Sequence, residues 1–133
     1  MHSALQQGWS YTLHIAYASS WCVAITLAAP SDLSSRAVDM SNAVTAGMRA
    51  LVYSGDVDMC LPFTGTAAWT ASLRLPEHRP WRQWHVDGQV AGFNVRYQGL
   101  TYVTVRGAGH MVPELKPREA LHMFGTWLSG EAL

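Results

Sequence analysis

The run Ala50-Leu51-Val52-Tyr53 constrains the fold more than any other stretch of this sequence. Its four consecutive apolar residues are followed directly by Ser54-Gly55. Alternation of apolar and polar residues would indicate a strand with one face in water, whereas a short continuous apolar run suits a strand buried on both faces. Strands of that kind occur in parallel sheets that helices cover on both sides. The run therefore predicts a buried strand in an α/β sheet.

The rest of the chain supplies further strands and helices in an order that fits this class. Strands are expected over 81–86, 90–97 and 100–105, with turn signals at Asp87-Gly88 and Gln98-Gly99. Residues 31–46 and 63–73 read as helices, and the polar stretch 74–79 as a connection. A last helix begins at Pro117, and spacing predicts its buried face. The residues predicted for that face are Ala120, Leu121, Phe124 and Leu128.

Chemically capable side chains follow two of the expected strands. Asp56 and Asp58 lie in the loop "SGDVDMCLP" after the buried run, and His110 lies in "RGAGHMVP" after the strand 100–105. Loops at the carboxyl ends of strands carry the active sites of open α/β sheets. A carboxylate that orients an imidazole base is two thirds of a Ser-His-Asp triad. The order Asp then His is also that of α/β-hydrolases.

Less specific interpretations of these residues stay open. Taken alone, Asp56 and Asp58 would more often be turn residues that bond to backbone N–H groups. His110 alone would more often be a hydrogen-bonded loop histidine than a catalyst. The sequence contains no Gly-x-Ser-x-Gly motif, so the nucleophile expected of an α/β-hydrolase is missing.

Composition excludes several classes of function. The chain has 133 residues, 49% of them hydrophobic and 14% charged, with a formal net charge of zero. No basic run indicates nucleic acid as a partner. Cys22 and Cys60 do not form a metal-type cluster and can form at most one disulfide. We therefore expect neither a metal nor a cofactor.

The first thirty residues differ from the remainder. Residues 15–30 are apolar and uncharged, whereas charges become regular after Asp32. No Lys or Arg precedes this run, as a signal peptide would require, and Ser19-Ser20 interrupts a stretch that is already short for a membrane span. Two interpretations remain. The first is a cleaved signal peptide; the second is either a segment that packs on something else or an irregular N-terminus. We divide the chain into 1–30 and a domain over 31–133, and expect no membrane partner.

Residues 50–128 resemble the C-terminal part of plant-type serine carboxypeptidases and serine carboxypeptidase-like proteins. The resemblance is carried by "LVYSGDVDMCLPFTGTAAWTASL", "PWRQWHVDGQVAGF", "LTYVTVRGAGHMVPELKPREALHMF" and "WLSG". These motifs are long and occur in the order and spacing of that family. The resemblance implies the C-terminal portion of an α/β-hydrolase sheet, a fold that is incomplete by itself.

The resemblance also implies roles for individual residues. The second Asp of "GDVD", Asp58, corresponds to the acid of the family's triad, and the first, Asp56, to a residue that shapes the loop. The His of "GAGH", His110, corresponds to the base. Met111 would border the pocket for the leaving residue of a peptide, and Cys60 lies in a loop that lines the pocket on the other side of the scissile bond.

The parts of the family pattern that this sequence lacks define three hypotheses. The family's nucleophilic Ser, oxyanion-hole glycines and carboxylate-gripping Asn and Glu are absent, so we expect the chain alone to be inactive. In the first hypothesis, the chain is part of a carboxypeptidase that needs an N-terminal chain and acts on peptide C-termini. In the second, it is the equivalent part of an acyltransferase or a hydroxynitrile lyase. In the third, it is a non-catalytic truncated product. The resemblance further implies a secreted or vacuolar location.

Overall fold

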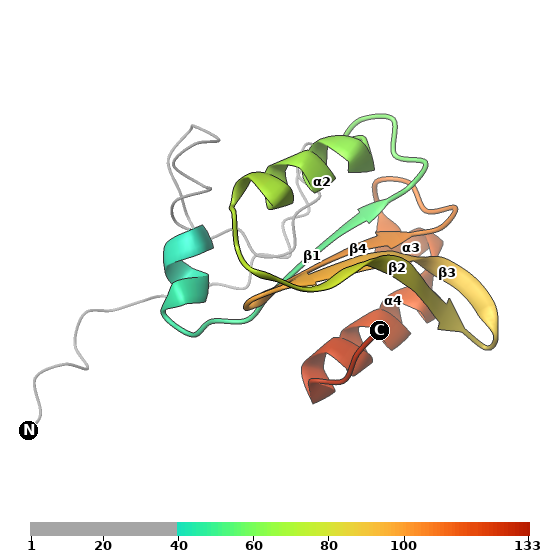
Figure 1. Cartoon of the computed structure of the whole chain (residues 1–133). Helices are drawn as coiled ribbons and strands as arrows, with labels where there is room; N and C mark the ends of the chain where they lie inside the picture. Colours follow the sequence, from blue (N-terminus) through green and yellow to red (C-terminus); the bar gives the residue numbers. More distant parts are fainter. Residues whose placement is uncertain (1–39) are drawn as a thin grey trace, which may run out of the picture.

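A computed structural model of the chain describes residues 40–133 and shows a mixed sheet between helical layers (Figure 1). The first element in this range is a helical segment, residues 40–45, which agrees with the part of the expected helix over 31–46 that falls inside the range. The rest of that helix, the segment 1–30 and Cys22 lie outside the described residues. The fold is of the predicted α/β class.

The sheet has four strands in the order β1-β4-β3-β2. Strand β1 (Ala50–Gly55) pairs in parallel with β4 (Leu100–Val105), from Ala50 opposite Leu100 to Gly55 opposite Val105. Strands β3 (Gln89–Tyr97) and β2 (Glu77–Val86) continue the sheet in antiparallel pairings. The predicted parallel strand is thus confirmed, and the two parallel strands end at the same edge of the sheet.

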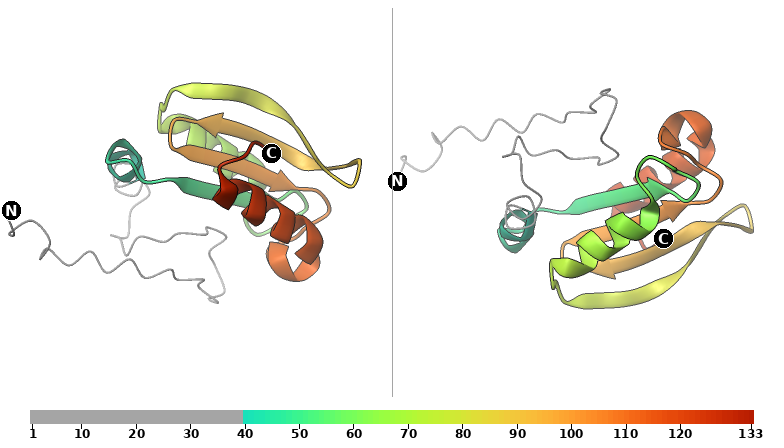
Figure 2. Two further views of the ribbon diagram at one scale, coloured as in Figure 1. Left: turned by 90° about the horizontal axis from the view of Figure 1, so that it is seen from below. Right: turned by 90° about the horizontal axis from the view of Figure 1, so that it is seen from above.

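Each face of the sheet is covered by helices, so β1 and β4 are buried on both sides (Figure 2). Leu100 and Tyr102 of β4 face the layer of α2 (Phe63–Ser72), while Val103 and Val105 face the layer of α4 (Pro117–Ser129). Period-two alternation along the strand places these pairs on opposite faces. The core therefore lies in two layers that hold β1 and β4 in the middle.

Strand β2 begins earlier than the sequence predicted. The stretch 74–79 was expected to be a connection, yet β2 starts at Glu77 and runs through Pro80. Its pairing with β3 shifts register at several points, and the strand lies at the edge of the described sheet. An edge strand with bulges tolerates a proline because one side of its backbone needs no ladder partner.

The C-terminal segment differs from the prediction in two respects. A short helix α3 (Val112–Leu115) precedes α4, and the sequence did not predict it. The buried face of α4 consists of Ala120 and Met123, whereas the predicted Leu121 and Leu128 are 75% and 64% exposed. The predicted face was therefore rotated about the helix axis; the beginning of α4 at Pro117 was predicted correctly.

Candidate active site at the carboxyl ends of two parallel strands

The loops that follow β1 and β4 are joined by hydrogen bonds between their backbones and side chains. The Asp56 N–H donates to the Val105 carbonyl at 3.1 Å, and the Val57 N–H donates to the Ala108 carbonyl at 3.1 Å. The Gly107 N–H donates to Oδ1 of Asp56 at 2.6 Å. Asp56 therefore ties the acid-bearing loop to the His-bearing loop, consistent with the loop-shaping role implied by the resemblance.

Gly55 lets the two loops approach closely. A Cβ atom at this position would lie 2.2 Å from the carbonyl oxygen of Ala108 and 2.3 Å from that of Gly109. Both distances are far below a van der Waals contact, and both atoms belong to the backbone, which cannot rotate away. The close approach needs glycine because of the missing side chain; the backbone of Gly55 itself is not in the left-handed region.

Asp58 and His110 meet at this junction. Oδ2 of Asp58 lies 2.9 Å from Nδ1 of His110, although the two residues are 52 positions apart in the sequence. The Asp58 side chain is 2% exposed and the His110 side chain is 27% exposed. The carboxylate is thus buried behind an imidazole that solvent can reach, which is the relation of the acid to the base in a catalytic triad.

Backbone N–H groups hold the other oxygen of Asp58. Oδ1 accepts from the Cys60 N–H at 2.8 Å and from the Leu61 N–H at 3.1 Å. Burial alone would raise the pKa of the Asp58 carboxyl, but the bonds from Leu61, His110 and Cys60 outweigh it and hold that pKa below its usual value. Asp58 is therefore ionised at neutral pH and can stabilise a positive charge on His110.

The turn interpretation of Asp58 anticipated bonds of this kind, but the sequence prediction did not identify Cys60 and Leu61 as the donors. An aspartate whose side chain bonds to N–H groups two and three residues ahead forms an Asx turn. The spacing Asp58 to Cys60 and Leu61 was visible in the sequence, and Pro62 follows directly. The turn interpretation of Asp58 and the triad interpretation are therefore compatible, because its two oxygens serve different partners.

The two residues predicted to line substrate pockets each follow one member of the pair in the sequence, Cys60 two positions after Asp58 and Met111 directly after His110. Cys60 is exposed and its thiol is free, and Met111 is 38% exposed at the N-terminal end of α3. Val57 and Met59 of the acid loop are also exposed, at 58% and 91%. Among residues 40–133, no group of His, Cys, Asp and Glu side chains is arranged to hold a metal ion.

An aspartate and a histidine at the ends of neighbouring parallel strands, in this chain order, match the placement of the acid and the base in α/β-hydrolases. Comparison with known families identifies the particular one. The family described as serine carboxypeptidase matches residues 12–130, so the chain belongs to the serine carboxypeptidase family. The match begins inside the segment 1–30 that was set apart above, and the boundary at residue 30 stays a prediction.

Individual relatives agree with this assignment. Serine carboxypeptidase 1 of Hordeum vulgare and serine carboxypeptidase-like 20 of Arabidopsis thaliana are each 50% identical over 93 residues, which is 69% of this chain and 19% of each relative. The putative serine carboxypeptidase-like 52 of Arabidopsis thaliana is 42% identical over 102 residues, 76% of this chain and 54% of that protein. The chain thus spans about one fifth of the length of the first two relatives.

A solved structure supports the fold. The prohormone-processing carboxypeptidase of Saccharomyces cerevisiae superposes with a TM-score of 0.57 at 19% sequence identity, covering 68% of this chain and 22% of that one. At this identity the likeness concerns the fold alone. In the described part of the chain, no helix has the length and apolar content needed to cross a membrane.

Proposed function

We propose that this chain supplies the acid and the base of a serine carboxypeptidase that releases C-terminal residues from peptides. The observation that carries the proposal is the 2.9 Å contact between Oδ2 of the buried Asp58 and Nδ1 of the accessible His110. The 50% identity to a plant serine carboxypeptidase supports the reaction class. The serine comes from polypeptide outside the printed sequence, which has no Gly-x-Ser-x-Gly motif.

The two side chains divide the chemistry between them. Nε2 of His110 takes the proton from the serine as its oxygen attacks the carbonyl carbon of the last peptide bond. Asp58 holds the proton on Nδ1 and stabilises the imidazolium that forms. His110 then gives the proton to the leaving amine as the C–N bond breaks, and water hydrolyses the acyl-enzyme by the reverse sequence.

Substrate contacts are proposed for the residues beside this pair. Met111 follows the base directly and is partly exposed, so its apolar side chain suits a hydrophobic C-terminal residue of the peptide. Cys60 follows the acid by two residues and is exposed, on the other side of the scissile bond. The proposed partner is an N-terminal carboxypeptidase part, and the family resemblance supports a secreted or vacuolar compartment.

The test is complementation with the N-terminal part of a relative that contains the serine motif. The mixture should release the C-terminal residue from blocked dipeptides, and Asp58→Asn should lower kcat about 10⁴-fold because His110 then adopts the wrong tautomer. Asp87→Asn is the matched control, since it makes the same chemical change at an exposed hairpin residue that pairs with Arg118. Equal activity of the two variants would refute the role of Asp58.

The same assay separates the other hypotheses. An acyl-enzyme can be released to an acceptor other than water, so acyl transfer from a glucose ester without peptidase activity would identify an acyltransferase. Cleavage of a cyanohydrin alone would identify a hydroxynitrile lyase. A chain that neither pairs with the N-terminal part nor restores any activity is the non-catalytic product.

A further inference from the structure

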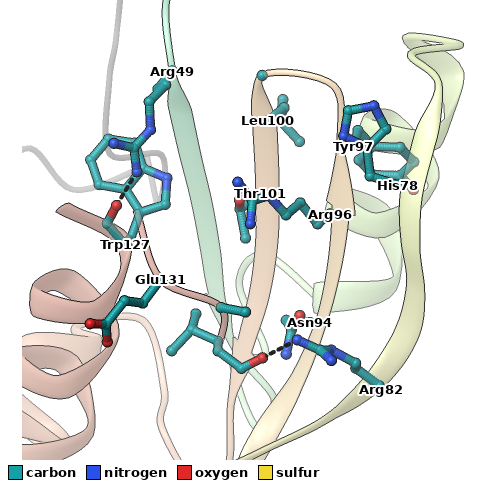
Figure 3. A pocket seen from close by; sticks show the side chains of 13 residues that line it. Arg49, His78, Arg82, Asn94, Arg96, Tyr97, Leu100, Thr101, Trp127 and Glu131 are labelled. Carbon is teal, nitrogen blue, oxygen red and sulfur yellow. Dashed lines mark hydrogen bonds between the residues drawn. The ribbon is translucent and has the colours of Figure 1, made fainter. Parts of the chain in front are cut away.

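A second polar site lies at the opposite end of the parallel strands from Asp58 and His110. A cavity of about 200 Å³ is lined by residues that include Arg49, Arg82, Asn94, Arg96 and Glu131 (Figure 3). Arg49 directly precedes β1, whereas Asp58 follows its end, so about 20 Å of strand separates the two sites. The cavity is therefore distinct from the proposed active site.

Two of the arginines are partly committed to the C-terminal segment. Arg49 donates to the carbonyls of Trp127 and Leu128, and its guanidinium lies 4.8 Å from the centre of the Trp127 ring. A cation at this place suits the last carbonyls of α4, which lack partners inside the helix. Nη2 of Arg82 donates to a terminal carboxylate oxygen of Leu133, the last residue of the printed sequence, at 2.5 Å. These bonds fix the guanidinium groups at two sides of the cavity.

Buried donors in the cavity remain unused. Asn94 is 2% exposed, and its Nδ2 finds no acceptor among residues 40–133. Nε of Arg82 is likewise buried and has no acceptor in the described range. A buried donor without an acceptor costs about 1–3 kcal/mol, so native proteins rarely leave one unpaired. Two such donors on cross-strand partners, Arg82 opposite Asn94, indicate that an acceptor from outside the described chain completes the site.

The charge of the lining defines that acceptor. Three arginines face two carboxylates, the side chain of Glu131 and the terminal carboxylate of Leu133 in the printed sequence, which leaves one positive charge in excess. No ion pair joins Arg96 to an acidic side chain within the described residues. A cavity of about 200 Å³ has room for a small ion together with several water molecules.

From these observations we propose that the cavity binds a small oxyanion such as phosphate or sulfate. Arg96 and Nε of Arg82 supply charge-assisted hydrogen bonds, which are stronger than those between neutral groups, and Nδ2 of Asn94 adds a neutral donor. The bound ion would connect β2 and β3 to the C-terminal segment that Arg82 and Arg49 already hold. Binding therefore raises the stability of this end of the sheet.

Titration of the full chain with sodium phosphate, at constant ionic strength, tests the proposal. Phosphate should raise the melting temperature and shift the Asn94 side-chain amide signal in NMR spectra, whereas sodium chloride should do neither. Arg96→Gln should weaken phosphate affinity by about tenfold or more. The matched control Arg118→Gln, on the exposed face of α4, should bind within twofold of the parent chain. A phosphorylated sugar in a parallel titration distinguishes a free ion from a phosphate group on a larger molecule.

Asn94→Asp provides a second test that does not depend on the identity of the ion. The new carboxylate would accept hydrogen bonds from Arg82, so this variant should melt at a higher temperature than the parent without phosphate. It should also lose the response to phosphate, because it repels the anion. An equal effect of chloride and phosphate, or unchanged phosphate binding in Arg96→Gln and Asn94→Asp, would overturn the proposal.

Discussion

Replacing Gly55 by alanine should separate the two loops that carry Asp58 and His110. The added methyl carbon would lie 2.2 Å from the Ala108 carbonyl oxygen and 2.6 Å from its carbon. Because these are backbone atoms of the neighbouring loop, the clash is relieved only by moving one loop away from the other. That movement breaks the bond from the Val57 N–H to the Ala108 carbonyl and lengthens the contact between Asp58 and His110.

The magnitude follows from the nature of the clash. Inserting one carbon into a packed site costs about 1–3 kcal/mol, and the upper end applies where backbone must move. Gly65→Ala is the matched control because nothing lies within 4 Å of its Cβ position in the exposed first turns of α2. That change should stabilise the helix by about 0.5–1 kcal/mol. The two Gly→Ala variants should thus differ by about 3–4 kcal/mol.

Urea unfolding followed by circular dichroism measures this difference. With a slope of about 2 kcal/mol per molar urea, the midpoint of Gly55→Ala should fall by about 1.5 M, and that of Gly65→Ala should rise slightly. In the complemented enzyme, Gly55→Ala should also lower kcat by a larger factor than the decrease in the folded fraction of the chain. A Gly55→Ala chain as stable as the parent would show that the loops are not in contact as described.

Three further predictions concern individual side chains. Removing the Asp56 carboxylate by Asp56→Asn weakens the charge-assisted bond from the Gly107 N–H, and the free energy of unfolding should fall by about 1 kcal/mol in urea titrations. The folded-state pKa of Asp58 is lowered, so its ionised carboxylate contributes to the free energy of unfolding. This contribution is complete above the unfolded-state pKa of about 3.9 and is lost as the pH falls through the folded-state pKa. Asp58→Asn should therefore flatten the decline of stability below about pH 4, and unfolding curves with equal pH dependence in both chains would contradict this. Met123→Ala should lower the free energy of unfolding by about 2–5 kcal/mol because Met123 is fully buried. Leu121→Ala, at a 75% exposed position, should change it by less than about 0.5 kcal/mol. Equal losses in the two variants would support the helix face predicted from the sequence.

Strands β1 and β4 could be predicted because their signals are local, whereas their parallel pairing with each other came from the structure. Both strands are short apolar or β-branched runs, and each ends at a glycine-containing loop with a chemically capable side chain. The hairpin at Asp87-Gly88 was equally readable, since both residues have positive φ, 49° and 75°, as this turn requires. Such features depend on a few neighbouring residues and need no knowledge of the tertiary structure.

The buried face of α4 could not be predicted in this way. Two sets of residues satisfy helical spacing, one with Leu121 and Leu128 and one with Met123 and Trp127, and both contain Ala120. Only contact with Val103 and Val105 of the sheet selects the second set. The start of β2 was missed for a related reason, because Pro80 excludes a central strand but not an edge strand, and edge position is a property of the whole sheet.

The geometry of the candidate site follows from contacts that join backbone to backbone. Gly55, Val57 and Ala108 bring the two loops together, and the N–H groups of Cys60 and Leu61 set the direction of the Asp58 carboxylate. The sequence identified Asp58 and His110 and allowed a turn role for Asp58, but it did not show which backbone groups bring the loops together, because backbone donors carry no residue signature. All of these contacts lie within residues 55–110, so none of them involves the segment that would bring the serine. If the proposed function is correct, association with that segment completes a preorganised pair, and its rate should be insensitive to conservative changes at Asp58.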